Sequence, residues 1–132
     1  MYLLDTNIFL EYILSRTRVE EVKDFFHRAD PMTLYISDFS LHTLGVIFMK
    51  EHKPREFLRF VNEDIIASGI RVISVFPENF SLVTGASVRF HLDFDDAYQY
   101  AAAEKAGLLI VSFDKDFDRT EKGRIEPKYL AT

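Results

Sequence analysis

The chain has 132 residues, 48% of them hydrophobic, which is enough for one core that buries about two-thirds of the unfolded chain's surface. Sixteen basic and 21 acidic residues give a net charge of −5, which excludes a protein that holds nucleic acid by bulk positive charge alone. The absence of cysteine excludes disulfides and thiolate metal sites, and with no signal-peptide pattern and no membrane-length apolar run, we expect a cytoplasmic protein that does not enter a membrane.

The first half of the chain alternates short apolar runs with segments of helical spacing. The first run ends at Asp5, a good helix-cap residue, and the second helix stops at Asp30 before a proline. The expected elements are a strand, two helices, a strand and two helices, over residues 2–4, 8–14, 19–29, 33–37, 39–50 and 54–68.

The second half continues this alternation. Pro77 suits the first turn of a helix, and Gly107 suits the end of an alanine-rich one. The expected elements are a strand, two helices, a strand and a weak last strand, over residues 70–75, 77–90, 97–106, 108–111 and 125–130. Such alternation predicts an α/β fold with a mostly parallel sheet of four to five strands, as a single domain over residues 1–132.

Acidic side chains fall where such a sheet binds ligands. Asp5 and Asp114 come at the carboxyl ends of the first and fourth strands, Asp96 starts the helix that feeds the fourth, and Asp116 follows two residues after Asp114. Carboxylates gathered this closely repel one another unless a cation holds them. Oxygen ligands without histidine or cysteine suit Mg²⁺ or Mn²⁺, and such an ion supports hydrolysis of phosphodiester bonds.

Three blocks of sequence resemble the PIN domain family, and in particular its small VapC-type toxins. They are LLDTNIFL at residues 3–10, FDDA at 94–97 and GLLIVSFDKDF at 107–117. The resemblance implies a three-layer α/β/α fold and Mg²⁺- or Mn²⁺-dependent cleavage of single-stranded or structured RNA. It also implies a homodimer that a cognate antitoxin neutralises, as in a type II toxin-antitoxin system.

The resemblance also assigns site residues. Carried over position by position, the family's metal-site and catalytic acids fall on Asp5, Asp96 and Asp114, with Asp116 as a further metal ligand. Ser37 and Ser112 match positions that support the acidic cluster, although a serine at a strand end is common in any protein.

One position departs from the family pattern. Within ISDFSLHTLG, residues 36–45, the place where the family carries a metal-site glutamate is held by Thr43. No acid lies between Asp38 and Glu51, and neither of these two shares a helix face with Thr43. A threonine hydroxyl could still orient a water at the site, whereas we expect the adjacent His42 to point elsewhere.

Other polar residues near these motifs also have structural interpretations. Asn7 either orients Asp5 or contacts a water of the metal, or it acts as a helix cap, and a cap role is compatible with the functional one. Asp93 and Asp95 are interpreted as cap and turn residues, and Asp118 as a solvent-facing one.

Three functions remain open on these grounds. The leading hypothesis is a metal-dependent endoribonuclease of toxin type, which leaves a 5′-phosphate and a 3′-hydroxyl. The second is a PIN fold that has lost turnover and acts as an RNA- or protein-binding module, an alternative that Thr43 keeps open. The third, a phosphotransferase with Asp5 as covalent nucleophile, is disfavoured because Asn7 stands where such enzymes usually carry a second acid.

Overall fold

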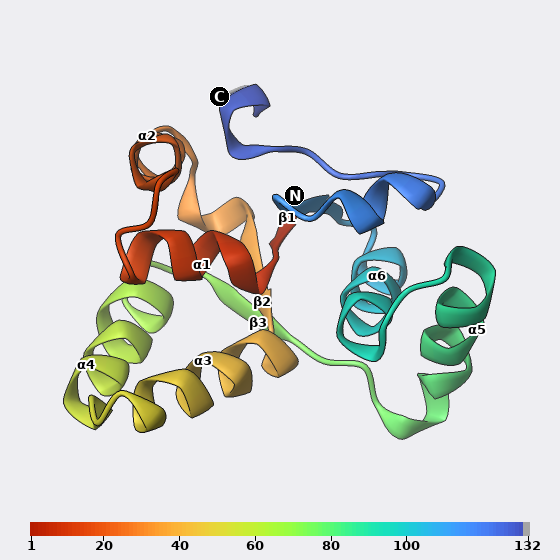
Figure 1. The fold of residues 1–132 in the computed structure, drawn as a ribbon, viewed down its shortest axis with the longest axis horizontal. Helices are drawn as coiled ribbons and strands as arrows, with labels where there is room; N and C mark the ends of the chain where they lie inside the picture. The colour runs from red at the N-terminus through yellow and green to blue at the C-terminus, as the bar shows by residue number, and fades with distance from the viewer. Residues whose placement is uncertain (131–132) are drawn as a thin grey trace.

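A computed structural model describes residues 1–130, which fold into three layers, helices on both faces of one sheet (Figure 1). The strands are β1 (Tyr2–Leu4), β2 (Leu34–Ser37), β3 (Arg71–Ile73) and β4 (Leu109–Val111). They pair in the order β3-β2-β1-β4, and every pairing is parallel. The expected α/β/α architecture and the first four expected strands are therefore confirmed.

The expected fifth strand is wrong. After β4 the chain returns to the sheet for one parallel bridge, between Val111 and Ile125. Pro127 then opens a short 3-10 turn, Pro127–Tyr129. A proline has no N–H to donate to a strand ladder, so pairing stops where the proline enters.

Six α-helices connect and cover the strands in the described part of the chain. They are α1 (Thr6–Ile13), α2 (Val19–Arg28), α3 (Asp38–Lys50), α4 (Pro54–Arg59), α5 (Phe80–Phe90) and α6 (Phe94–Ala106). A π-helical segment, Phe60–Ile66, continues α4 along the stretch expected to be one helix. Over residues 1–130, no helix combines the length and the apolar character needed to cross a membrane.

Adjacent residues of the inner strands serve opposite faces of the sheet. Leu3 packs into a cluster with α5 and α6, whereas Leu4 packs into a second cluster with α1, α2 and the π-helical segment. Ile110 and Val111 divide in the same way. This alternation follows from the two-residue period of a strand, and Figure 1 shows α1 and α2 on one side of the strands with α5 and α6 on the other.

Tyr98 ties α6 to the two elements that flank the carboxyl edge of the sheet. Its hydroxyl accepts a hydrogen bond from Val75 N (2.8 Å), just beyond β3, and donates one to Asp38 Oδ1 (2.7 Å), at the start of α3. Tyr98 is buried, with 5% of the residue's surface exposed. One phenol therefore sets how the amino end of α6 sits against the sheet.

We expect Tyr98→Phe to lower the free energy of unfolding by about 1–3 kcal/mol, because it leaves the buried N–H of Val75 without an acceptor. Urea denaturation would measure the change. Tyr100→Phe is the matched control: its hydroxyl bonds only to Glu104, one turn along the same helix, and its loss should cost less than about 0.5 kcal/mol. Equal losses for the two variants would contradict the role given to Tyr98.

Candidate functional site

Three of the predicted acids meet at the carboxyl edge of the sheet. Asp5, Asp96 and Asp114 line one cavity of about 240 Å³, although up to 109 positions separate them in the sequence. Asp5 directly follows β1, Asp96 lies in the first turn of α6, and Asp114 follows β4. This is the edge at which parallel sheets bind their ligands.

The tightest acidic group contains three of the four acids predicted as metal ligands. Among residues 1–130, the carboxylates that can bring one oxygen each within 4.8 Å of the others belong to Asp96, Asp114 and Asp116. Asp5 borders the same cavity but is outside this group. The turn that carries two of the acids is fixed, because Asp116 N donates to Asp114 Oδ1 (2.8 Å) and Asp116 Oδ1 pairs with Arg119 (3.0 Å).

Asp5 is held by three hydrogen bonds at once. Its Oδ1 accepts from Thr6 N (2.8 Å) and Gln99 Nε2 (3.1 Å), and its Oδ2 accepts from Ser112 Oγ (2.7 Å). Only 7% of the residue is exposed. Burial raises the pKa of Asp5 above its ordinary value, and this effect exceeds the opposite effect of the hydrogen bonds.

Ser112 connects the two strand ends. Its hydroxyl donates to Asp5 and accepts from Asn7 Nδ2 (3.2 Å) and Asp114 N (2.9 Å), so its donor and both lone pairs are used. Asn7 Oδ1 accepts in turn from Phe113 N (3.3 Å). Asn7 thus bonds to the hydroxyl that holds Asp5, while the side chain that caps α1 is that of Asp5.

Asp96 is the acid on which the neighbouring charges converge. Burial, followed by the nearby charges of Asp114, Asp95, Asp5 and Asp116, raises its pKa to about 8. Only 7% of the residue is exposed. Without a cation, burial and repulsion thus favour the protonated form of Asp96, as expected for carboxylates forced together.

Two buried polar residues of the site were missed at the sequence level. Gln99 and Ser40 have 2% and 0% exposure, and Gln99 Nε2 donates to Ser40 Oγ at 2.7 Å. Ser40 Oγ also bonds Thr6 Oγ1 (2.7 Å). The signal was present in the spacing: Gln99 comes three residues after Asp96 and therefore shares its helix face.

Thr43 lies in α3 and Ser37 directly precedes it, and their hydroxyls make different hydrogen bonds. Thr43 lines the acidic cavity, and its hydroxyl donates back to Phe39 O (2.9 Å). Ser37 caps α3 by accepting from Ser40 N (3.0 Å), which places Ser40 beside Gln99. The exposed His42 is absent from the residues that line the cavity.

The remaining acids lie where the sequence suggested. Asp93 and Asp95 are exposed at the start of α6, although the Asp93 side chain makes no capping bond. Asp118 is more than half exposed and pairs with Arg124.

The side chains fit a hard divalent cation. The candidate ligands are all oxygens, and their mutual repulsion is relieved when a positive ion lies between them. In the described part of the chain, the acidic cavity is lined by no histidine, and the sequence has no cysteine. Asp96, Asp114 and Asp116 are the residues that would hold the ion, with Asp5 beside them.

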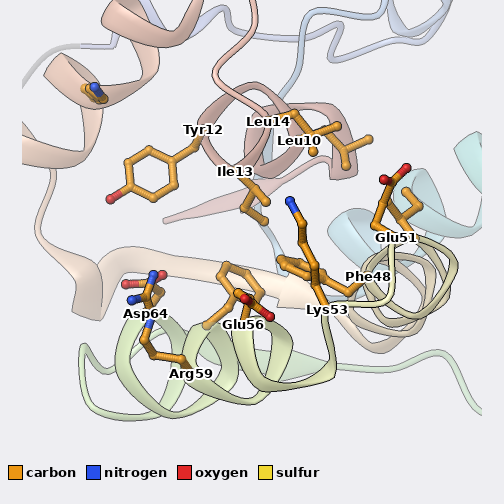
Figure 2. Close-up of a pocket in the computed structure, with 13 residues that line it drawn as sticks. Leu10, Tyr12, Ile13, Leu14, Phe48, Glu51, Lys53, Glu56, Arg59 and Asp64 are labelled. Carbon is orange, nitrogen blue, oxygen red and sulfur yellow. The ribbon is translucent and has the colours of Figure 1, made fainter.

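A second cavity, of about 360 Å³, lies between α1, α3 and α4 (Figure 2). Figure 2 shows Ile13 and Lys53 pointing into it, and its walls mix apolar side chains with acids and bases. Leu10 borders both this cavity and the acidic one. The larger cavity therefore adjoins the acidic site, but its charges are of both signs and its acids do not converge.

Comparison with known proteins identifies one family and several solved structures with a similar fold. The family model of the PIN domain matches residues 2–123. No curated protein matches the chain in sequence.

Three solved structures illustrate the fold similarity. A toxin-antitoxin complex from Klebsiella pneumoniae is 21% identical, with a TM-score of 0.76 over 96% of this chain and 98% of that one. FitAcB from Neisseria gonorrhoeae is 19% identical, with a TM-score of 0.75 over 98% and 100%. VapC20 of Mycobacterium tuberculosis, a sarcin-ricin loop cleaving toxin, is 18% identical, with a TM-score of 0.79 over 96% and 100%. At these identities the similarity shows the fold.

The raised pKa of Asp96 makes stability depend on pH. Between its ordinary value of 3.8 and about 8, the folded state keeps a proton that the unfolded state releases. The free energy of unfolding therefore falls as pH rises through this window. Asp96→Asn has no such proton, so in EDTA we expect its melting temperature to rise relative to wild type as pH goes from 5 to about 8.

Thermal melts in EDTA at several pH values would measure this difference. Asp93→Asn is the matched control for the loss of one acidic charge, because Asp93 is exposed in the same helix start. A melting-temperature difference between Asp96→Asn and wild type that does not change with pH would contradict the raised pKa of Asp96.

Proposed function

The chain belongs to the PIN domain family, and from this premise we propose that it is a metal-dependent endoribonuclease, the toxin of a type II toxin-antitoxin pair in the cytoplasm. The observation that carries the proposal is the acidic group Asp96, Asp114 and Asp116, which lies at the carboxyl edge of the sheet with Asp5 beside it. A structural role alone gives no reason for carboxylates to gather so closely that one keeps its proton at neutral pH.

The side chains have distinct tasks in this function. Asp96, Asp114 and Asp116 would hold Mg²⁺ or Mn²⁺, and Asp96 must release its proton when the ion binds. Asp5 is fixed in one orientation by Thr6, Gln99 and Ser112 and borders the place of reaction. The bound ion would polarise a phosphoryl oxygen and lower the pKa of a water. Hydrolysis in which a water oxygen bonds to phosphorus, the bond to the 3′ oxygen breaks and a proton of the water passes to that oxygen would give a 5′-phosphate and a 3′-hydroxyl.

A second candidate function is an RNA- or protein-binding module without turnover. It is favoured by Thr43, which brings no acid to the cavity and whose hydroxyl is already engaged with Phe39 O. The two functions separate in one assay, because a binding module holds RNA without cutting it.

We expect the purified protein to cleave single-stranded RNA in Mg²⁺ or Mn²⁺ and to stop in EDTA. Asp114→Asn should lower the rate by about 100-fold or more, because it removes a charge that holds the ion. Gel electrophoresis of end-labelled RNA measures both. Asp118→Asn, an exposed acid of the same turn region, should cleave like wild type.

If wild type cleaves RNA no faster than Asp114→Asn does, the proposed ribonuclease function is wrong. Retention of RNA by that inactive protein in a gel-shift assay would then support the binding module.

We also propose the cavity between α1, α3 and α4 as the docking place of an antitoxin peptide. Its mixed apolar and charged lining suits an amphipathic segment, and Leu10 places it next to the acidic site. A homodimer is the expected assembly, and exposed apolar side chains of α5 such as Leu82 and Val88 offer a surface for it.

Co-expression of this chain with the product of the gene immediately upstream tests the docking place. A small protein should co-purify with wild type, and Leu14→Arg should weaken its binding by about tenfold or more, because Leu14 is an exposed lining residue. Met32→Arg, at an exposed residue outside the cavity, should bind like wild type. Unchanged binding by Leu14→Arg would contradict this assignment.

A further inference from the structure

The carboxamide of Gln99 is the polar group of the acidic cavity whose hydrogen bonds are incomplete. Gln99 lines that cavity from α6 with 2% exposure, and it is the one glutamine of the sequence. Its Nε2 donates to Asp5 Oδ1 (3.1 Å) and to Ser40 Oγ (2.7 Å). Because a carboxylate oxygen can only accept from the nitrogen end of an amide, Asp5 fixes which end is which.

The other end of this amide has no partner. Gln99 Oε1 is buried and accepts no hydrogen bond from any of residues 1–130. Buried amide oxygens almost always have a partner, so an orphaned one beside a functional cavity indicates that something else binds there.

Within residues 1–130, no neighbouring side chain is seen to donate to this oxygen. The hydroxyl of Thr43 donates to Phe39 O, that of Thr6 bonds to Ser40 Oγ, and Asn7 Nδ2 donates to Ser112 Oγ. Asp95, Asp96 and Asp114 are acceptors in the ionised form in which carboxylates hold a cation. A cation, or a water bound to one, is a partner that both the amide oxygen and these carboxylates can share.

We propose that Gln99 Oε1 is a neutral oxygen donor to the divalent cation of this site, directly or through one of its waters, while Nε2 fixes Asp5. This inference rests on the proposed metal-dependent function. Gln99 would add an oxygen without adding negative charge to a site where carboxylates already repel one another. It would do so in a cavity to which α3 brings Thr43 and no acid.

The single glutamine permits a direct test on the unmodified protein. Labelling with glutamine that carries ¹³C at its carboxamide carbon gives one Gln99 signal, because no other glutamine is present. Titration with Mg²⁺ should shift this signal with the same midpoint that calorimetry gives for Mg²⁺ binding, and Mn²⁺ should broaden it. A signal that stays in place while calorimetry reports binding overturns the proposal.

Two substitutions separate a cation ligand from a purely structural amide. Gln99→Met keeps the volume but removes both polar ends, and it should weaken Mg²⁺ binding by about tenfold or more. Gln99→Glu keeps an oxygen and adds a charge, and it should tighten Mg²⁺ binding by about tenfold. If Gln99 only held Asp5 through its N–H groups, Gln99→Glu would instead weaken binding, because the ionised side chain has no donor and repels Asp5.

The outcomes separate a failure of the role of Gln99 from a failure of the proposed metal-dependent function. Melting temperatures in EDTA show whether each variant is folded, independently of the ion. If wild type binds neither Mg²⁺ nor Mn²⁺, the proposed metal-dependent function fails and this inference fails with it. If wild type binds the ion while Gln99→Met keeps its affinity, only the role of Gln99 is overturned.

Discussion

The parallel pairing of β1 with β4 is the constraint on which the acidic site depends. Leu3 and Leu4 pair with Ile110 and Val111, and Asp5 N extends the ladder by donating to Val111 O (3.0 Å). That last rung brings Asp5 beside Ser112, which lies 107 positions later in the sequence. The shared Ser112 hydroxyl then fixes the turn that carries Asp114. The site is thus a product of sheet register, since a shift of one residue would turn Asp5 to the other face.

The same pairing creates an electrostatic conflict. Carboxylates from β1, α6 and the turn after β4 are brought to one partly dry cavity, where burial and mutual repulsion raise the pKa of Asp5 and Asp96. Hydrogen bonds to Asp5 offset part of this cost. A divalent cation would remove the conflict, because it would place a positive charge between the carboxylates.

The sequence predicted the layers of the fold because its apolar runs and helix signals were local and strong. Pro127 and the single bridge at Ile125 explain the one missing strand, since a weak apolar pattern cannot overcome an absent N–H donor. Asp5 and Asp114 were placed by their position after strands, a rule of topology, and Asp96 by its position at the start of a helix. The spacing of Gln99 from Asp96 indicates a shared helix face, but the contact of Gln99 with Ser40 depends on how α3 and α6 pack across the sheet edge, which no pattern within one segment encodes.

Helix α3 brings the uncharged Thr43, and no acid, to the cavity, whereas α6 brings a neutral oxygen donor. Thr43 adds no charge, and its hydroxyl bonds within its own helix, so α3 contributes little to the field at this edge of the sheet. Gln99 brings an oxygen from α6 that no protein group uses, together with an N–H that steadies Asp5. The orphaned Gln99 oxygen and the raised pKa of Asp96 both mark groups of this cavity that lack a compensating partner. A cation bound between them would supply a partner to the carboxylates and to the amide oxygen at the same time.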